Sequence, residues 1–308
     1  MMASLAPPSN PSRNLVTNPR TKAPFQIAKT HPISDLLLPF RSIHTQLKLS
    51  TGTTSEKRLT TAQAVSERVE EGTTMAQGGE NVKLLGAWAS PFVIRTRIAL
   101  NLKGVDYEFL EEVFGVKSEL LLESNPVYKK IPVLIHDGKP VCESMIIVQY
   151  IDEVWATKAP AILPADPYDR ALHRFWAYYV DDKLFPSVSA ISRAQTEEAK
   201  AEAMEQVFAG LKLLEEAFQK CSKGKGFFGG DTIGYVDIAL GCILAWLKAT
   251  ENMTGIKFFD EAKTPLLAQW VERFCANDAV RGVMPETDKM VEFAKMLQAK
   301  FKAAASAK

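Results

Sequence analysis

Residues 82–104 read VKLLGAWASPFVIRTRIALNLKG, and this stretch decides the fold of the chain. Its apolar beginning, Val82 to Trp88, predicts a short buried strand. Ser90 and Pro91 then predict the start of a helix, because serine is a favoured N-cap and proline fits the first helical turn. The apolar face of that helix recurs every four residues, at Ile94, Ile98 and Leu102. A strand that runs into a helix start directs free N–H groups and the positive end of the helix dipole to one point, which favours an anion, although most Ser-Pro pairs do no more than cap a helix.

The sequence that follows alternates between strand and helix patterns up to residue 157. The expected elements are a strand at Tyr107–Val113, a helical turn at Ser118–Ser124, strands at Pro132–Ile135 and Val141–Cys142, and a helix from Glu143. The turn at residues 137–140 joins the last two strands. The order is βαβαββα, so we expect residues 82–157 to form an α+β domain.

Beyond this domain the sequence predicts only helices. Residues 158–167 contain three prolines and no periodicity, so we expect a linker there. From residue 168 to residue 302, apolar residues recur at helical spacing, which predicts an all-helical domain. Its expected buried faces are Leu172, Phe175 and Tyr179; Met204, Val207, Phe208, Leu211, Leu214 and Phe218; and Ile238, Cys242, Ala245 and Trp246.

The first 74 residues differ in composition from the rest. They hold seven prolines, two aromatic residues, and nine Lys and Arg against five Asp and Glu, a net charge of +4, whereas residues 75–308 carry a net charge of −3. Such a segment buries too little apolar surface to offset the entropy lost on ordering, so we expect a disordered extension. Its basic, hydroxyl-rich composition resembles an organelle transit peptide. The alternative is that the protein begins at Met75 and that the upstream part is an artefact of the gene model.

The overall composition argues against several classes of protein. A net charge of +1 over 308 residues gives no basis for binding nucleic acid or an acidic membrane, and apolar runs such as Ile238–Leu247 are too short to span a bilayer. The four cysteines, Cys142, Cys221, Cys242 and Cys275, lack metal-ligand spacing and are typical of a reducing compartment. We therefore expect a cytosolic protein without a metal, or a chloroplast or mitochondrial one if residues 1–74 act as a transit peptide.

Two further features of the α+β domain indicate ligand binding. Ile131 precedes Pro132 at a strand start, where a cis peptide bond would turn the Ile131 backbone outward to pair with an extended peptide, and a trans bond fits equally well. Glu143 and Ser144 begin a helix whose N–H groups can bind a carboxylate, with Glu143 facing an ammonium group, although Ser144 can also be a simple cap. With Ser90, these features offer a thiolate site, a backbone partner and an amino-acid clamp, which match the groups of glutathione.

Three stretches resemble the thioredoxin-like domain of glutathione transferases, and specifically the tau class of plants. They are WASPFVIRTRIAL from Trp88, NPVYKKIPVLIHDGKPVCES from Asn125 and IIVQYIDEVW from Ile146. The resemblance extends through the helical domain and says nothing of residues 1–74. It implies an enzyme that conjugates the thiolate of its co-substrate glutathione to small hydrophobic electrophiles in detoxification and stress response. It also implies a homodimer and is compatible with glutathione peroxidase activity.

The resemblance implies roles for individual residues. Ser90 is the catalytic residue, which donates a hydrogen bond to the glutathione sulfur and is not itself a nucleophile. The glutathione site is implied to contain Ser90, Lys117 and Lys130 near the glycyl end, Ile131 for backbone pairing, and Glu143 and Ser144 at the γ-glutamyl end. A thiol pKa of about 8.5 would fall by about one unit or more beside a hydroxyl donor at a helix N-terminus, so most of the thiol would ionise at neutral pH.

The hydrophobic substrate site is expected between Phe92 and the first helix of the helical domain. Tyr178, Tyr179 and Asp182 are candidates there, although each can equally be core or surface. Gly234 and Asp237 resemble the family's capping box, with glycine in place of Ser or Thr at a cost of about a few tenths of a kcal/mol. Asp237 and Pro132 are expected to serve the fold rather than the chemistry.

Two other functions compete with this prediction. A glutathione-dependent thiol oxidoreductase needs a cysteine where Ser90 stands, because a mixed disulfide must form there, and Cys142 belongs to the predicted fourth strand. A non-catalytic carrier of hydrophobic ligands would keep the same fold, which alone does not exclude it. The physiological electrophile does not follow from the sequence.

Overall fold

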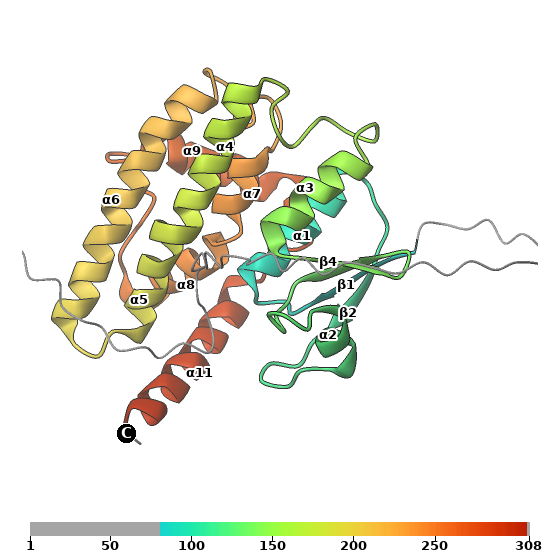
Figure 1. Cartoon of the computed structure of the whole chain (residues 1–308). Coiled ribbons are helices and arrows are strands. Elements are labelled where there is room, and N and C mark those ends of the chain that lie inside the picture. The colour runs from blue at the N-terminus through green and yellow to red at the C-terminus, as the bar shows by residue number, and fades with distance from the viewer. Residues whose placement is uncertain (1–80, 307–308) are drawn as a thin grey trace, which may run out of the picture. The chain divides into compact units, whose positions relative to one another are not determined.

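The computed structural model describes residues 81–306, which belong to one compact unit, Thr60–Lys308 (Figure 1). The predictions of a disordered extension and of a transit peptide concern residues 1–74 and lie outside the described residues. Figure 1 shows a small sheet with helices α1 and α3 over one face and α2 under the other, beside a larger group of long helices.

The sheet has four strands in the order β2-β1-β3-β4. They are β1 (Val82–Gly86), β2 (Glu108–Glu111), β3 (Val133–His136) and β4 (Lys139–Cys142). β1 is parallel to β2 and antiparallel to β3, which is antiparallel to β4. Because side chains alternate along a strand, Leu84 joins the core with α1 and α3, whereas Leu85 packs with Leu121 of α2 on the other face.

Three helices complete the predicted βαβαββα order, which is confirmed. They are α1 (Pro91–Leu102), α2 (Glu119–Ser124) and α3 (Ser144–Val154). β1 ends at Gly86, two residues before the predicted Trp88. A Cβ atom on Gly86 would lie 2.5 Å from Cγ1 of Val93, so glycine lets the end of the strand approach α1 closely. The chain then turns through residues 87–89 into Ser90.

The regular elements beyond α3 in the described residues are helices, as predicted, apart from an isolated β-bridge between Phe227 and Gly230. They are α4 (Pro167–Tyr179), a π-helical segment η1 (Val180–Leu184), α5 (Phe185–Arg193), α6 (Glu197–Cys221), α7 (Tyr235–Gly241), α8 (Leu244–Thr254), α9 (Pro265–Ala276), α10 (Asp278–Arg281) and α11 (Thr287–Ser306). None of the helices within residues 81–306 is both long enough and apolar enough to cross a membrane.

The predicted buried face of α6 is confirmed, and that of α4 is wrong in part. The third predicted face is divided between two helices, since Ile238 lies in α7, Cys242 caps its end, and Ala245 and Trp246 lie in α8. The buried residues of α4 are His173 and Ala177, whereas Phe175 is 56% exposed. Of Leu172, Phe175 and Tyr179, Tyr179 alone packs against the core, and it is only partly buried. Instead, the polar His173 occupies the core side of this helix.

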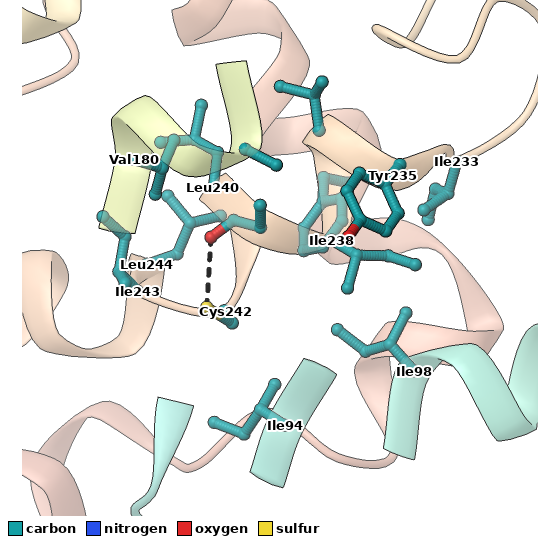
Figure 2. Close-up of a cluster of buried hydrophobic side chains, with 14 of the residues drawn as sticks. Ile94, Ile98, Val180, Ile233, Tyr235, Ile238, Leu240, Cys242, Ile243 and Leu244 are labelled. Carbon is teal, nitrogen blue, oxygen red and sulfur yellow. Dashed lines mark hydrogen bonds between the residues drawn. The ribbon is translucent and has the colours of Figure 1, made fainter. Parts of the chain in front are cut away.

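The two parts of the chain share one continuous hydrophobic core. Figure 2 shows Ile94 and Ile98 of α1 pointing towards side chains of α7, among them Ile238. The same cluster includes Val180 and Leu184 of η1. The sheet-containing part and the helical part are therefore packed through α1, the helix that Ser90 begins.

A buried ion pair fixes the connecting segment to the α+β part. Nζ of Lys103, at the end of α1, lies 2.9 Å from a carboxylate oxygen of Asp152 in α3 and donates to the carbonyl oxygens of Ala159 and Pro160. Asp152 also accepts hydrogen bonds from the backbone N–H groups of Ile162 and Leu163 at 2.8 and 3.0 Å. The segment expected to be a linker is thus held along its length by charged hydrogen bonds.

The capping residue Asp237 lies in the core of the helical part. Its two carboxylate oxygens accept four hydrogen bonds, from the backbone N–H groups of Phe228, Gly229 and Gly234 at 2.8–2.9 Å and from Nε1 of Trp270 at 2.7 Å. Burial raises the pKa of Asp237 to about 6, while these N–H donors act in the opposite direction. Asp237 thereby joins the loop before α7 to α9.

Candidate functional site

Ser90 is the N-cap residue of α1 and ends the short turn that connects β1 to this helix. Its backbone is extended (φ −77°, ψ 118°), and its Oγ accepts a weak hydrogen bond of 3.4 Å from the backbone N–H of Val93. The side chain is half-buried, and Pro91 occupies the first helical turn. A hydroxyl at the start of a twelve-residue helix can donate to an anion that the helix dipole also stabilises.

An aromatic group lies beside Ser90, which we call the aromatic wall: Trp88, Phe114, Trp246 and Phe293. The ring of Phe293 in α11 lies 5.4, 5.6 and 6.1 Å from the rings of Trp88, Phe114 and Trp246. Nε1 of Trp246 donates to the carbonyl oxygen of Ala89 at 3.2 Å, directly before Ser90. Sequence reasoning missed this wall, because its members come from four separate segments and no local pattern connects them.

The Ile131–Pro132 peptide bond is cis, which settles the choice left open by the sequence. Asn125 holds the approach to this bond, since its Nδ2 donates to the carbonyl oxygen of Lys130 at 2.9 Å. The backbone N–H and C=O of Ile131 have no hydrogen-bond partner within the described part of the chain. They are therefore free to pair with an extended backbone segment.

Glu143 and Ser144 form the start of α3. Glu143 adopts a left-handed backbone (φ 72°), unusual for a residue other than glycine, and its side chain is half-buried. Burial raises the pKa of its carboxyl group, nearby Lys130 lowers it, and Asp181 raises it again. Ser144 is buried at the first position of the helix and does not act as its N-cap. A carboxylate of Glu143 beside free helix N–H groups suits a ligand that carries both an ammonium and a carboxylate group.

Arg95 is almost completely buried and donates a hydrogen bond to the side chain of Ser144. Its Nη1 donates to Oγ of Ser144 at 3.3 Å and to Asp181 at 3.0 Å, and its Nη2 donates to the other oxygen of Asp181. Nη2 also donates to the carbonyl oxygen of Ala239 at 3.2 Å, and Nε to Sγ of Cys242 at 3.1 Å. Burial alone lowers the pKa of Arg95, but Asp181 and Cys242 outweigh it and raise the pKa above its ordinary value. The guanidinium is therefore a permanent cation that connects the two parts of the chain.

Sequence reasoning missed Arg95 and Asp181, although one signal was available. Arg95 stands three residues before Ile98, on the side of the helix that the apolar residues mark as buried. A charged residue on a buried face demands a partner. The sequence does not say that this partner is Asp181, 86 positions away.

The two lysines predicted for the site are both exposed. Lys117 lies in the loop after β2, three residues beyond Phe114 of the aromatic wall, and Lys130 lies directly before Ile131. Neither forms an ion pair with a carboxylate among residues 81–306, although Lys130 is close enough to Glu143 to lower its pKa. Both ammonium groups are thus available to an anionic ligand.

Three of the four residues predicted for the hydrophobic site, Asp182, Tyr178 and Tyr179, lie close to Lys183, whose pKa they raise. Phe92 contacts Phe185 edge-on at 5.5 Å and lies under the Arg95 guanidinium. Tyr178 is 67% exposed, and Tyr179 packs on Trp176 at 5.6 Å. Asp182 forms an ion pair with Lys183 at 3.0 Å, whereas its neighbour Asp181 is the aspartate that faces inward to Arg95. Of the four, Phe92 alone adjoins Ser90 in sequence.

Among residues 81–306, no three His, Cys, Asp or Glu side chains are grouped so that they could hold a metal ion. The four cysteines are free thiols, and Cys142 lies in β4 as predicted.

Known proteins match both parts of the chain. The family models of the glutathione S-transferase N-terminal and C-terminal domains match residues 80–153 and 168–278. The chain is 61% identical over 217 residues to glutathione S-transferase U17 of Arabidopsis thaliana, covering 70% of this chain and 96% of that protein. It is 54% identical over 228 residues to the probable glutathione S-transferase GSTU6 of Oryza sativa subsp. japonica, covering 72% and 96%.

Solved structures of glutathione transferases also match this chain. A tau class glutathione S-transferase from mango, Mangifera indica, matches with 63% identity and a TM-score of 0.68, covering 70% of this chain and 98% of that one. A rice enzyme, OsGSTU1 in complex with glutathione, matches with 38% identity and a TM-score of 0.66, covering 72% and 98%.

Proposed function

The chain belongs to the tau class of glutathione S-transferases, and we propose that Ser90 is the residue that stabilises the glutathione thiolate in it. The protein is an enzyme, and glutathione is its co-substrate. The carrier function considered from the sequence is not favoured, since the relatives are named as transferases. The observation that carries the proposal is the place of Ser90 at the N-terminus of α1, with its hydroxyl free to donate.

The chemistry follows from this position. A hydroxyl donor and the positive end of α1 both favour the charged form of a bound thiol, so they lower its pKa from about 8.5. The thiolate sulfur then attacks an electrophilic carbon, a C–S bond forms, and the leaving group departs with the bonding electron pair. Ser90 keeps its proton throughout and acts only as a hydrogen-bond donor.

The surrounding groups would orient the tripeptide. The unpaired backbone N–H and C=O of Ile131 would pair with the cysteinyl residue of glutathione. Glu143 would hold the γ-glutamyl ammonium, while the start of α3 with Ser144 would hold the α-carboxylate. Lys117 and Lys130 would attract the glycyl carboxylate. These assignments are supported by chemical complementarity at each end of the peptide.

Hydrophobic electrophiles would bind against the aromatic wall. Phe293 brings the ring of Trp88, two residues before Ser90, together with those of Phe114 and Trp246. Phe92, Tyr178, Tyr179 and Asp182 stay predictions for this site. The same thiolate would also attack a peroxide oxygen, and a second glutathione would then complete reduction to the alcohol, water and glutathione disulfide.

The decisive experiment replaces Ser90 by alanine in the full chain. Conjugation of glutathione to 1-chloro-2,4-dinitrobenzene is measured from pH 6 to pH 9. We expect kcat/KM at pH 6.5 to fall about a hundredfold, because one donor to the reacting anion is lost. We also expect the activity that remains to rise towards high pH, where the thiol ionises without help. Ser90→Thr, which keeps the hydroxyl, should retain more activity than Ser90→Ala.

Thr196→Ala is the matched control. Thr196 is the N-cap of α6, where its Oγ1 accepts from the N–H of Ala199 at 3.1 Å, and the variant therefore loses a helix cap far from the site. Its pH profile should equal that of the wild type. Equal conjugation by Ser90→Ala and the wild type would refute the role of Ser90.

We also propose a homodimer. Exposed apolar residues lie on α3 and α4, namely Ile146, Val154, Phe175 and Tyr178. Large apolar side chains exposed to solvent support a protein interface there. Sedimentation at micromolar concentration should show a dimer, and Phe175→Glu should convert it to a monomer. A wild-type protein that sediments only as a monomer would contradict this.

Two further proposals concern the domain boundaries and the cellular location of the protein. We propose a glutathione-binding domain at 82–157, a connecting segment at 158–167 and a helical domain at 168–302, supported by the separate family matches to the two parts. We propose the cytosol as the location, supported by the four free thiols, which suit a reducing compartment.

A further inference from the structure

Helix α11 places two lysines against the aromatic wall. Nζ of Lys289 lies 4.1 Å from the centre of the Trp88 ring, and Nζ of Lys300 lies 5.3 Å from the centre of the Phe114 ring. An ammonium group within about 6 Å of an aromatic face is attracted to it. Both cations are therefore held at rings that contact Phe293.

The spacing along α11 explains why both lysines reach the wall. Lys289, Phe293 and Lys300 stand at intervals of four and seven residues, which places them on one face of a helix. Lys289 and Lys300 are about 16 Å apart along the axis, as 11 residues rise about 1.5 Å each. The face of α11 that meets the wall therefore carries a cation at each end. Figure 1 shows α11 leaving the body of the molecule towards its free C-terminal end.

Among residues 81–306, no acidic side chain forms an ion pair with Lys289 or Lys300. Glu292 on the same helix is paired with Lys295 at 3.0 Å, and Glu112, near Phe114 in sequence, accepts hydrogen bonds from the N–H and the hydroxyl of Ser118. An aromatic surface flanked by two unpaired cations is complementary to an aromatic molecule that carries a negative charge.

We propose that the preferred electrophiles of this enzyme are aromatic or otherwise apolar molecules that bear a carboxylate or sulfonate group. This inference rests on the proposed function of Ser90 and the aromatic wall, and it adds the charge of the second substrate. The apolar part of such a molecule packs on the rings, and its anionic group pairs with Lys289 or Lys300. The reaction is unchanged, since the glutathione sulfur forms the new C–S bond and a leaving group such as chloride departs with the bonding pair.

The test compares 4-chloro-3,5-dinitrobenzoate with its methyl ester, which share the reacting carbon and the leaving group and differ in charge. The full chain conjugates each at pH 7, and each kcat/KM is divided by the rate constant of the uncatalysed reaction with glutathione. We expect this enhancement to be about tenfold greater for the acid at low ionic strength. We expect the preference to shrink in 0.5 M NaCl, because exposed charges are screened.

The double variant Lys289→Gln/Lys300→Gln should reduce the acid-to-ester ratio about tenfold, and Lys289→Arg/Lys300→Arg should keep it. Lys295→Gln is the matched control, since it removes a lysine of the same helix that is already paired with Glu292. An acid-to-ester ratio that is the same in wild type and Gln variant would overturn the inference. So would a rise in the KM for glutathione with both electrophiles, because the lysines would then serve the co-substrate.

Conjugation of the uncharged ester tests the proposed function separately from this inference, which concerns only the charged acid. If the ester is conjugated and Ser90→Ala abolishes this, the proposed function stands whatever the acid does. If neither compound is conjugated, the proposed function fails and the inference fails with it. If the ester alone is conjugated well, the inference fails by itself.

Discussion

Arg95 joins segments that are far apart in sequence. Its guanidinium donates to Ser144 of α3, to Asp181 of η1, and to Ala239 and Cys242 at the end of α7. We expect Arg95→Met to lower the free energy of unfolding by about 3 kcal/mol, because it leaves Asp181 and a buried carbonyl group without their donor. Because Oγ of Ser144 also loses its donor, the KM for glutathione should rise. Urea denaturation and steady-state kinetics measure the two effects.

Arg97→Met is the control for this prediction. Arg97 lies on the same helix, donates to the hydroxyl of Tyr107 at 3.1 Å, and rests on the Phe109 ring, but it is only half-buried. We expect a loss of about 1 kcal/mol and no change in the KM for glutathione. The prediction for Arg95 is wrong if the two variants are equally stable.

His173 links stability to pH. Burial lowers its pKa below the ordinary 6.5, Asp169 opposes this and Lys223 adds to it, and Nδ1 is buried without a hydrogen-bond partner in the described part of the chain. A lowered folded-state pKa means that the unfolded chain takes up the proton first. This contribution to stability is therefore complete above pH 6.5 and is lost as the pH falls below it.

Replacing His173 by Gln should remove that part of the pH dependence. We expect the difference in unfolding free energy between wild type and variant to change by at most about 1.4 kcal/mol per pH unit, the limit for one proton. The two proteins are compared because Asp237, with its pKa raised to about 6, also changes the unfolding free energy between pH 4 and pH 6, with the opposite sign. This contribution is the same in wild type and variant and cancels in the difference. His136→Gln is the control, and parallel curves for wild type and His173→Gln from pH 7 to pH 5 would rule the linkage out.

Residues governed by local rules were the ones that the sequence predicted. Ser90 at the N-cap follows from its place before Pro91 and an apolar helix face, because capping depends on only a few neighbouring residues. The Ile131–Pro132 bond was left open between cis and trans, since the local preference is small and tertiary contacts decide it. Arg95 was missed because its partners depend on packing between distant segments.

At the scale of elements, the loop before α7 is fixed by one buried carboxylate. The four donors to Asp237 use both of its oxygens. In Asp237→Asn an NH2 group must face N–H donors, so we expect a loss of about 3 kcal/mol in the free energy of unfolding at pH 7. Denaturant midpoints measure this, and kcat of the folded variant should stay near that of the wild type because Asp237 is not in the proposed site.

Asp231→Asn is the control for the capping residue. Asp231 lies six positions earlier, is exposed, and forms a surface ion pair with Lys225 at 3.2 Å. Surface pairs contribute about 0–1 kcal/mol, so this variant should be nearly as stable as the wild type. Similar midpoints for the two variants would show that the loop is held by other contacts.

The order of elements was predictable, but the helix faces were predictable only in part. α6 follows its apolar spacing because it is long and has one buried side. α4 does not, since His173 lies inside and Phe175 outside. The π-helical segment η1 between α4 and α5 was not predicted either. This segment carries Asp181, whose partner Arg95 belongs to the other part of the chain. No pattern within α4 or α5 therefore predicts the π-helical segment.

At the scale of the whole molecule, the sequence indicated two domains but not how much they share. One hydrophobic cluster runs from Val82 in β1 to Val283 after α10. Lys103 and Asp152 hold the connecting segment, and Gln149 of α3 donates to the hydroxyl of Tyr235 at 2.9 Å across the two parts. A shared core depends on side-chain packing between elements, which periodicity within one element does not encode. We therefore expect the domain that carries the proposed glutathione site to depend on the helices for its stability.

This dependence predicts that the α+β part does not fold alone. A fragment of residues 75–157 would expose Ile94 and Ile98 to water and leave the Arg95 guanidinium without Asp181, Ala239 and Cys242. The exposed apolar area costs about 25 cal/mol per Å², which is large compared with the net stability of a small domain. We expect a poorly dispersed amide NMR spectrum and no cooperative thermal transition for this fragment. A fragment of residues 75–308, which keeps all the helices that the structure describes, should unfold in one transition that is identical by circular dichroism and tryptophan fluorescence. A folded 75–157 fragment, or two separate transitions in the longer one, would show instead that the two parts are independent and that α1 needs no helical partner to hold Ser90 in place.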